Sequence, residues 1–326
     1  MMTNYQIFWN DIGSKIFKNL NTSTGKEIYV AKICNATLIN DFYKRKQAEK
    51  KLVEDTLYLD PNTKFFMAFI PQSTSLLINL FCCKTTMADV HNRLSSHGLA
   101  LEGCFTIEPQ TMLPAGMYAG YNIHTNKLFK SKMPSENRDP SYLVIDNHKL
   151  LRIMSHKEFM AYQPTSIALQ YLQGYRLFQN GKPFIPLDTM KNISTNIPGL
   201  PNNIPGSNVV IDYENLKLKI RNREVNFSEI GSKVKFVYSS LFDMNNGLLV
   251  VSTDSNNNIM IIYHPKIDYF NMMLLLSIIG CKDAILVCNA PNANIMWKET
   301  GLNRYNKTDF MGNPAQIISN VITFSS

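Results

Sequence analysis

The sequence has few glycines and prolines and no long apolar run. Its 326 residues include 15 Gly and 15 Pro, which is too few for a collagen-like or low-complexity chain. The longest apolar stretch near the C-terminus, residues 272–279, is about half of the ~20 residues that a transmembrane helix needs. We therefore expect no membrane-spanning helix.

The first residues lack the features of a secretory signal peptide. Residues 1–10 contain no positively charged segment followed by an apolar stretch. We therefore expect the protein to reside inside a cell, either free or associated with a virion or another assembly.

The six cysteines are dispersed and show no metal-ligand spacing. In a chain of this length such cysteines are usually buried free thiols, with a set of disulfides as the alternative. We therefore expect free thiols, no metal site and no cofactor. The cysteines are Cys34, Cys82, Cys83, Cys104, Cys281 and Cys288.

The excess of positive charge is small and has no pattern typical of nucleic-acid binding. Lys and Arg number 33 against 25 Asp and Glu, for a formal net charge of +8. The densest basic cluster, residues 44–46, is followed by a run of mixed sign over 49–55, with two Lys between acidic residues. A mixed-sign run of this kind is typical of a solvated helix face, so we do not expect a nucleic-acid partner.

Asparagine makes up roughly a tenth of the chain, above ordinary globular usage, and Lys, Ile and Tyr are also frequent. This bias is what an A/T-rich genome produces in its proteins. It suggests a viral or mobile-element source.

Apolar periodicity predicts an α+β fold with a mixed, largely antiparallel sheet and a few packed helices. A segment rich in Pro and Gly over 188–208 is predicted to be a loop insertion within one domain, with a domain boundary as the alternative. Helices are expected at 41–57, 87–94 and 269–279. Strands are expected at 27–33, 64–70, 76–82, 99–107, 117–123, 142–145, 149–154, 167–171, 233–238, 248–253, 259–263, 284–287 and 317–324.

The order of motifs in the C-terminal third resembles the phosphodiester glycosidase family, which is typified by N-acetylglucosamine-1-phosphodiester α-N-acetylglucosaminidase. A hairpin and a short helix lead to Ile-Gly-Cys-Lys-Asp-Ala at 279–284, then to a polar loop and to Ile-Ser-Asn-Val-Ile-Thr-Phe at 318–324. Upstream, residues 86–94, 102–106, 114–117 and 173–183 are similar to further family motifs in the same order. The resemblance implies a family-like domain over 76–326, preceded by an N-terminal extension with the first strands over 1–75.

Two signature loops of that family are altered here. Its Asp-Gly-Gly-Gly-Ser loop corresponds to Cys-Asn-Ala-Pro-Asn at 288–292, where the acid and all three glycines are replaced. The proline removes a backbone N–H, and the Cβ atoms restrict close approach of a ligand. Its Asn-Gly-Gly-Phe-Phe turn corresponds to Glu-Gly-Cys-Phe-Thr at 102–106.

This double loss leads us to expect a catalytically inactive relative, a pseudoenzyme that acts as a structural, self-assembling or binding protein. Its expected partners are further copies of itself or other structural proteins.

The alternative is an active hydrolase of a sugar-1-phosphodiester with a rebuilt site. In it Glu102 would act as acid or base, and Cys288 as a nucleophile with His124 or His264 as its partner. The candidate residues for binding a sugar-phosphate ligand are Arg176, Asn289, Asn292 and Asn320. This alternative requires Glu102, Arg176 and Asn320 to converge with the 288–294 loop.

Overall fold

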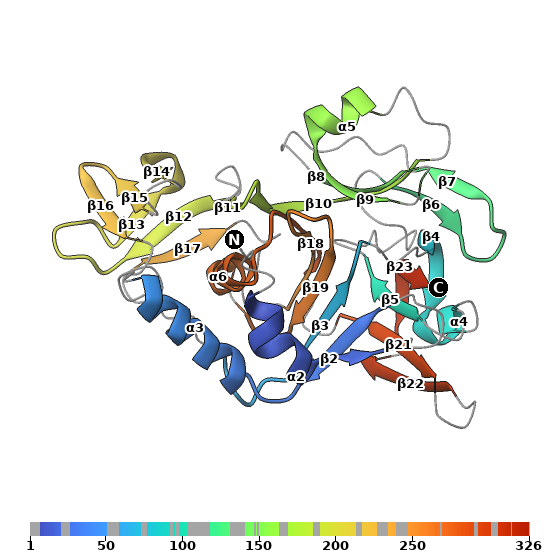
Figure 1. The fold of residues 1–326 in the computed structure, drawn as a ribbon. Helices are drawn as coiled ribbons and strands as arrows, with labels where there is room; N and C mark the ends of the chain where they lie inside the picture. Colours follow the sequence, from blue (N-terminus) through green and yellow to red (C-terminus); the bar gives the residue numbers. More distant parts are fainter. Residues whose placement is uncertain are drawn as a thin grey trace.

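The computed structural model describes most of the chain in discrete segments. The described residues are 7–20, 27–50, 59–72, 77–91, 94, 98–103, 118–130, 141–146, 148, 150–162, 169–184, 190–212, 217–226, 234–238, 247–267, 269–289, 293–300, 306–313 and 315–325. They are mostly strands with a few helices (Figure 1), in agreement with the expected α+β class.

The body of the protein contains two layers of β-structure. The strands of the first layer, in the order in which they pair, are β1 (Lys18–Asn19), β2 (Tyr29–Ile33), β3 (Phe65–Ile70), β19 (Ile259–His264), β18 (Leu248–Thr253), β20 (Asp283–Asn289), β10 (Gln170–Gln179) and β11 (Lys182–Pro183). All of these pairings are antiparallel.

The second layer contains β22 (Asn306–Met311), β21 (Ile295–Thr300), β5 (Gly98–Glu102), β23 (Ile317–Ser325), β4 (Leu77–Thr86), β6 (Tyr118–Asn122), β7 (Leu128–Lys130), β8 (Ser141–Ile145) and β9 (Leu151–Ser155). Here β4 and β6 pair in parallel, and the other described pairs are antiparallel. The sheet is therefore mixed and largely antiparallel, as expected.

Strand β10 belongs to both layers. Its first half, Gln170 to Gly174, pairs with β8, and from Tyr175 onward it pairs with β20. A register shift between Arg176 and Phe178 marks the irregularity within the second half. Such shifts increase local bend and twist, which lets one long strand pass from one sheet to the other.

Apolar side chains from both layers meet in a core between them. Strands β3 and β18 are buried along their whole length, so both of their faces are covered. Between the layers the rings of Phe66 and Trp297 pack with their centroids 5.0 Å apart. Cys288, one of the candidate residues, and Ile322, two positions after Asn320 on β23, both belong to this inter-sheet core.

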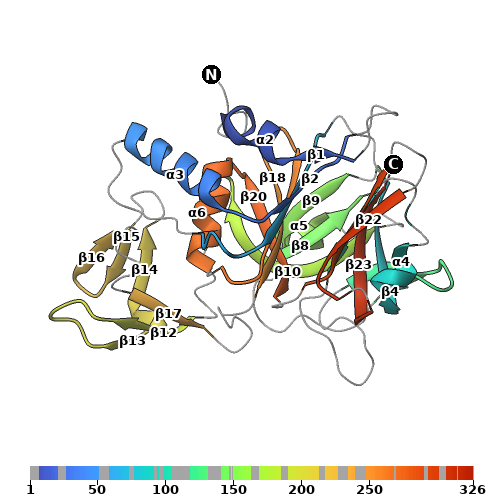
Figure 2. The ribbon, with the colours of Figure 1, turned by 90° about the horizontal axis from the view of Figure 1, so that it is seen from below.

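Helices cover the outer faces of the two layers (Figures 1 and 2). Helices α3 (Thr37–Lys50) and α6 (Tyr269–Ile279) pack on the first layer, and α6 ends at Gly280, which has a φ of +87°. Helices α4 (Met87–His91) and α5 (His156–Tyr162) pack on the second layer. The N-terminal turns, η1 (Trp9–Gly13) and α2 (Ser14–Ile16), also contribute to the core on the first layer.

The segment predicted to be a loop over 188–208 contains regular structure, which corrects that prediction. It holds β12 (Met190–Thr195), β13 (Asn203–Pro205) and the 3-10 turn η4 (Gly206–Asn208). Strand β12 pairs with β13 and β17 (Val234–Tyr238), and a second small sheet joins β14 (Val209–Asp212), β15 (Lys217–Ile220) and β16 (Arg223–Asn226). The inserted unit therefore extends to about residue 238 and projects from the body at the left of Figure 1.

The division predicted at residues 75 and 76 falls within 73–76, outside the described residues. On its N-terminal side, β3 pairs with both β2 and β19. The first strands are therefore integral to the first layer. No helix among the described residues is both long and apolar enough to cross a membrane.

Candidate functional site

Glu102 ends β5 and is held by Asn294, just before β21. Its Oε2 accepts hydrogen bonds from the backbone N–H of Asn294 at 3.0 Å and from Nδ2 of Asn294 at 2.8 Å. In return, the backbone N–H of Glu102 donates to the carbonyl oxygen of Asn294 at 2.8 Å. The Glu102 side chain is only 4% exposed, so this carboxyl group is part of the packed structure.

Asn294 connects this carboxyl group to the turn between β22 and β23. Its Oδ1 accepts from the backbone N–H of Asn313 at 2.7 Å, and its Nδ2 lies 3.3 Å from Oε1 of Gln316. Gly312 has a φ of +88°, and a Cβ there would lie 2.6 Å from Oδ1 of Asn294. Glu102 and Asn294 thus connect the end of β5, the start of β21 and the turn after β22, which is a structural role.

Burial raises the pKa of Glu102 above its ordinary value, while the two hydrogen bonds from Asn294 act in the opposite direction. A raised carboxyl pKa is common in general acids. A general acid must also reach its substrate within hydrogen-bond distance, and the burial of Glu102 and its bonds to Asn294 oppose this.

Cys288 lies on β20 and Tyr263 lies two strands away on β19, and both residues pair with Leu249 of the strand between them. The Cys288 thiol is 1% exposed. The Tyr263 hydroxyl accepts from the backbone N–H of Ala293 at 3.2 Å. Burial raises the pKa of Tyr263 to about 12, and the Cys288 and Glu102 side chains add to that shift.

Neither histidine proposed for Cys288 shares its surroundings. His264 packs its ring on Phe65, with centroids 5.1 Å apart, on the outer face of the first layer. Cys288 faces the inter-sheet core, so the sheet lies between these two side chains. His124 is exposed in the turn after β6, where its N–H donates to Oδ1 of Asn122.

The expected buried thiols are confirmed for Cys82, Cys281 and Cys288, all of which are free. Cys34 is also free but exposed, which corrects the expectation of burial for that residue. Burial raises the pKa of the Cys281 thiol to about 12, so it stays protonated at neutral pH. The Cys83 side chain and all of Cys104 lie outside the described residues.

Asn320 lies on β23, next to the residue that pairs with Glu102. The backbone N–H of Gly103 is 3.4 Å from the carbonyl oxygen of Asn320. A Cβ at Gly103 would lie 3.0 Å from Oδ1 of Asn320 and 2.8 Å from Cγ1 of Ile322. Because Gly103 has no Cβ, the Asn320 amide can occupy the space next to it.

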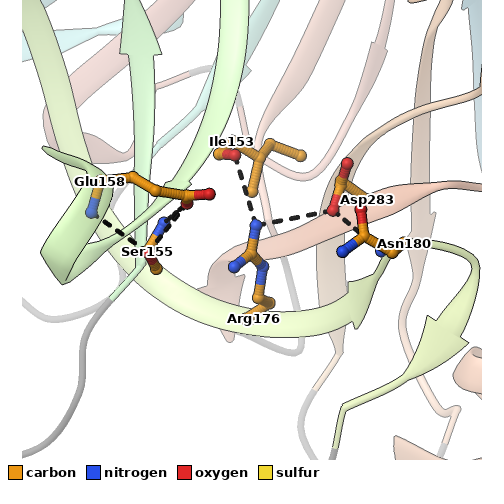
Figure 3. Close-up of polar contacts among 6 residues, drawn as sticks. All are labelled: Ile153, Ser155, Glu158, Arg176, Asn180 and Asp283. Atoms are coloured by element: carbon orange, nitrogen blue, oxygen red, sulfur yellow. Dashed lines mark hydrogen bonds and ion pairs between the residues drawn. The ribbon is translucent and has the colours of Figure 1, made fainter. Parts of the chain in front are cut away.

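Arg176 belongs to a different group of residues (Figure 3). One guanidinium nitrogen lies 3.5 Å from Oδ1 of Asp283 and 3.4 Å from the carbonyl oxygen of Ile153. Oδ1 of Asp283 also accepts from the backbone N–H of Asn180 at 3.2 Å. On the neighbouring segment the positive charge of Arg176 contributes to a lowered pKa of Glu158, after the larger effect of the Ser155 backbone N–H.

These contacts separate Arg176 from the other candidates. Asp283 and Cys288 are five residues apart on β20, a distance of about 16 Å along an extended strand. Glu102 bonds to Asn294, and the N–H of the next residue, Gly103, approaches the carbonyl oxygen of Asn320, whereas Arg176 contacts Asp283 at the opposite end of β20 from Cys288. The convergence that the hydrolase alternative requires is therefore absent for Arg176.

Two further candidates cannot be placed as side chains. Asn289 ends β20 and pairs with Leu248, but its side chain is outside what the structure describes. Asn292 lies entirely outside the described residues. Their ligand-binding role stays a prediction.

Sequence reasoning missed Asn294, Tyr263 and Asp283, the partners of the candidate residues. Each is distant in sequence from the residue it contacts; Asn294 is 192 positions from Glu102. No local pattern signals such a pair. Within the described part of the chain, no group of three or more His, Cys, Asp or Glu residues is placed to hold a metal ion.

Comparison with known proteins gives a distant likeness of fold. No protein-family model matches the chain, and none of the curated proteins compared with it matches its sequence. Among solved structures, the catalytic domain of zebrafish N-acetylglucosamine-1-phosphodiester α-N-acetylglucosaminidase, auto-inhibited by its pro-peptide, aligns with 100% of this chain and 94% of its own length. The TM-score is 0.47 and the sequence identity 8%.

Two further solved structures align less closely. A hypothetical protein from Synechocystis has a TM-score of 0.35 and 12% identity, over 95% of this chain and 61% of its own length. A putative exported protein from Burkholderia pseudomallei K96243 has a TM-score of 0.34 and 8% identity, over 98% of this chain and 88% of its own length. At these values the chain is similar to these proteins in fold, and distantly so.

Proposed function

We propose that this protein is a divergent, non-catalytic relative of the phosphodiester glycosidases, of viral or mobile-element origin, that acts as a structural, self-assembling protein. One observation supports this more than any other. The carboxyl group best placed to act as the acid or base, that of Glu102, is buried and accepts two hydrogen bonds from Asn294.

The other members of a catalytic set support the same proposal. A cysteine nucleophile needs a lowered pKa and a base beside it. The thiol of Cys288 is buried, with His264 on the other face of the sheet and His124 exposed in a turn. Arg176, the cation proposed for a phosphate, forms an ion pair with Asp283 instead.

The proposal is tested by light scattering and an activity assay on one sample of the full chain. We expect reversible, concentration-dependent assemblies and no release of N-acetylglucosamine from its 1-phosphate methyl diester. A discrete monomer or dimer that hydrolyses the diester, and that loses this activity in Cys288→Ala, would overturn the proposal and favour the hydrolase alternative. A monomer without activity would contradict the self-assembly part of the proposal and favour a role in binding another molecule.

A further inference from the structure

Asn320 combines a polar side chain with an apolar setting. Its side chain is 1% exposed, and within the part of the chain that the structure describes neither Nδ2 nor Oδ1 has a hydrogen-bond partner. Across the β4–β23 pair it lies opposite Cys82, and on the β5 side it contacts Gly103. Cys82 and Ile322 beside it belong to the apolar core between the sheets.

An arrangement of this kind needs an explanation, because a buried amide without partners costs free energy. Other buried polar side chains of the same region show the usual solution. The Asn294 amide, for example, bonds to Glu102, Gln316 and Asn313. Asn320 lies two strands away from Asn294, yet no side chain or backbone group among the described residues fills that role for it.

The local backbone is also built around this amide. The β4–β23 register shifts between Ile318 and Asn320, and β-bulges of this kind re-aim the side chains next to them. Gly103, with no Cβ, lies directly against Oδ1. Gly103 thus makes room for the amide itself, since a Cβ at this position would lie 3.0 Å from Oδ1 of Asn320.

We propose that the Asn320 carboxamide binds a neutral hydroxyl group, which accepts from Nδ2 and donates to Oδ1. A hydroxyl offers both functions on one small atom, and this matches the amide's paired donor and acceptor. Internal water and the hydroxyl of a sugar or polyol share this chemistry. Binding of a hydroxyl at Asn320 does not depend on whether the protein self-assembles.

The charges nearby favour a neutral group over a phosphate. The neighbour of Asn320 on β23, Val321, pairs with Glu102, so a carboxyl group belongs to the same strand pair. Arg176, the cation expected for a phosphate, is held by Asp283 toward the other end of β20. Lys298 donates to the carbonyl oxygen of Leu94 under α4. A buried anion beside Asn320 would therefore lack these positive groups.

A high-resolution crystal structure of the full chain tests the site without any substitution. The proposal predicts an oxygen atom within hydrogen-bond distance of both Nδ2 and Oδ1 of Asn320. Hydrogen bonds from both atoms to groups of the protein itself, or only carbon atoms around them, would overturn it.

Thermal unfolding in the presence of N-acetylglucosamine, glycerol or N-acetylglucosamine-1-phosphate distinguishes the sources of the hydroxyl. Because sugars and polyols also stabilise proteins by exclusion from their surface, the readout is the rise in Tm relative to Asn320→Ala. If a sugar or polyol supplies the hydroxyl, the neutral compound raises the Tm of the wild type and of Thr323→Val, a buried control on the opposite face of β23, more than that of Asn320→Ala. If water supplies it, each compound changes the Tm of all three proteins equally and the oxygen atom is still present in the crystal. A rise that depends on Asn320 and occurs only with the sugar phosphate would contradict a neutral ligand.

Discussion

At the scale of the residue, Glu102 shows how a carboxyl group can become structural. Its partners are the backbone N–H and the side-chain amide of Asn294, both of which are neutral donors. Burial therefore raises its pKa, although both bonds favour the ionised form. The position that sequence comparison suggests for an acid or base thus holds strand ends together.

The first prediction concerns the stability of Glu102 variants. Glu102→Ala leaves the backbone N–H and the Nδ2 of Asn294 without an acceptor, which lowers the free energy of unfolding by about 1–3 kcal/mol. Glu102→Gln retains an oxygen at the same place and loses less. Urea unfolding of the two variants measures both effects, and equal losses would show that the acceptor atom is not what matters.

The second prediction concerns pH. The pKa of Glu102 is raised above 4.5 in the folded state, so folding favours its protonated form. Its contribution to stability is complete below the unfolded-state pKa and is lost as the pH rises through the folded-state pKa. We expect the wild type to lose stability relative to Glu102→Gln as the pH increases over that window. Denaturant titrations at several pH values measure this, and the opposite trend would indicate a lowered pKa.

At the scale of the element, the bent strand β10 carries Arg176 to a point between β9 and β20 (Figure 3). Its guanidinium group contacts the carbonyl oxygen of Ile153 on β9 and the carboxylate of Asp283 on β20. Arg176 thus connects the two layers where β10 crosses between them.

The third prediction follows from this contact. Arg176→Met leaves the carboxylate of Asp283 without its ion-pair partner, and Asp283→Asn in the same chain removes the charge that was left. We expect a coupling energy of about 0.5–3 kcal/mol between the two substitutions in a double-mutant cycle of unfolding free energies. Simple additivity would show that the 3.5 Å contact contributes nothing.

The fourth prediction concerns the first turns of α4 and α5, which share one capping arrangement. The hydroxyl of Thr86 accepts from the N–H of Asp89, and Asp89 accepts from Thr86 in return; Ser155 and Glu158 do the same. Thr86→Ala and Ser155→Ala each lower the unfolding free energy by about 1 kcal/mol. The matched variants Thr86→Ser and Ser155→Thr keep an acceptor oxygen, and an equal loss in them would argue against capping.

At the scale of the whole molecule, strands with continuous apolar runs could be located from sequence. Strands β3, β18 and β19 are buried throughout, and their composition carries that information directly. Helix α6 ends at Gly280 as its sequence predicts. The helix expected over 41–57 begins earlier in the structure, in α3 at Thr37, where Asn35 accepts from the N–H of Thr37, and residues 51–57 lie outside the described residues.

Only part of the unit over 190–238 could be predicted: the strand expected at 233–238 is confirmed as β17, whereas the strands between 190 and 226 were not expected. Strand β12 consists mostly of polar residues, and among its described side chains Ile193 is the apolar one in the core. Its pairing with β17 joins residues about forty positions apart. The prolines at 198–205 favour a loop by their local backbone preference, and the pairing of β12 with β17 outweighs that preference.

The candidate site was predictable only in part for a related reason. The resemblance led us to expect Glu102, Arg176 and Asn320 to converge with the 288–294 loop; Glu102 does contact Asn294, and Gly103 contacts Asn320, but Arg176 contacts Asp283 instead. Asp283, which holds Arg176, is 107 positions away along the chain, and only the register of β10 with β20 brings them together. Contacts between residues so far apart in sequence depend on the whole fold, and a local sequence pattern does not predict them.

The central claim is that Glu102 has a structural role and no catalytic one. The most direct measurement is hydrolysis of an N-acetylglucosamine-1-phosphodiester by the wild type and by Glu102→Gln, with unfolding free energies from the same preparations. Our account predicts no hydrolysis by either protein and a stability difference that changes with pH. Hydrolysis by the wild type that is abolished in an equally stable Glu102→Gln would contradict it.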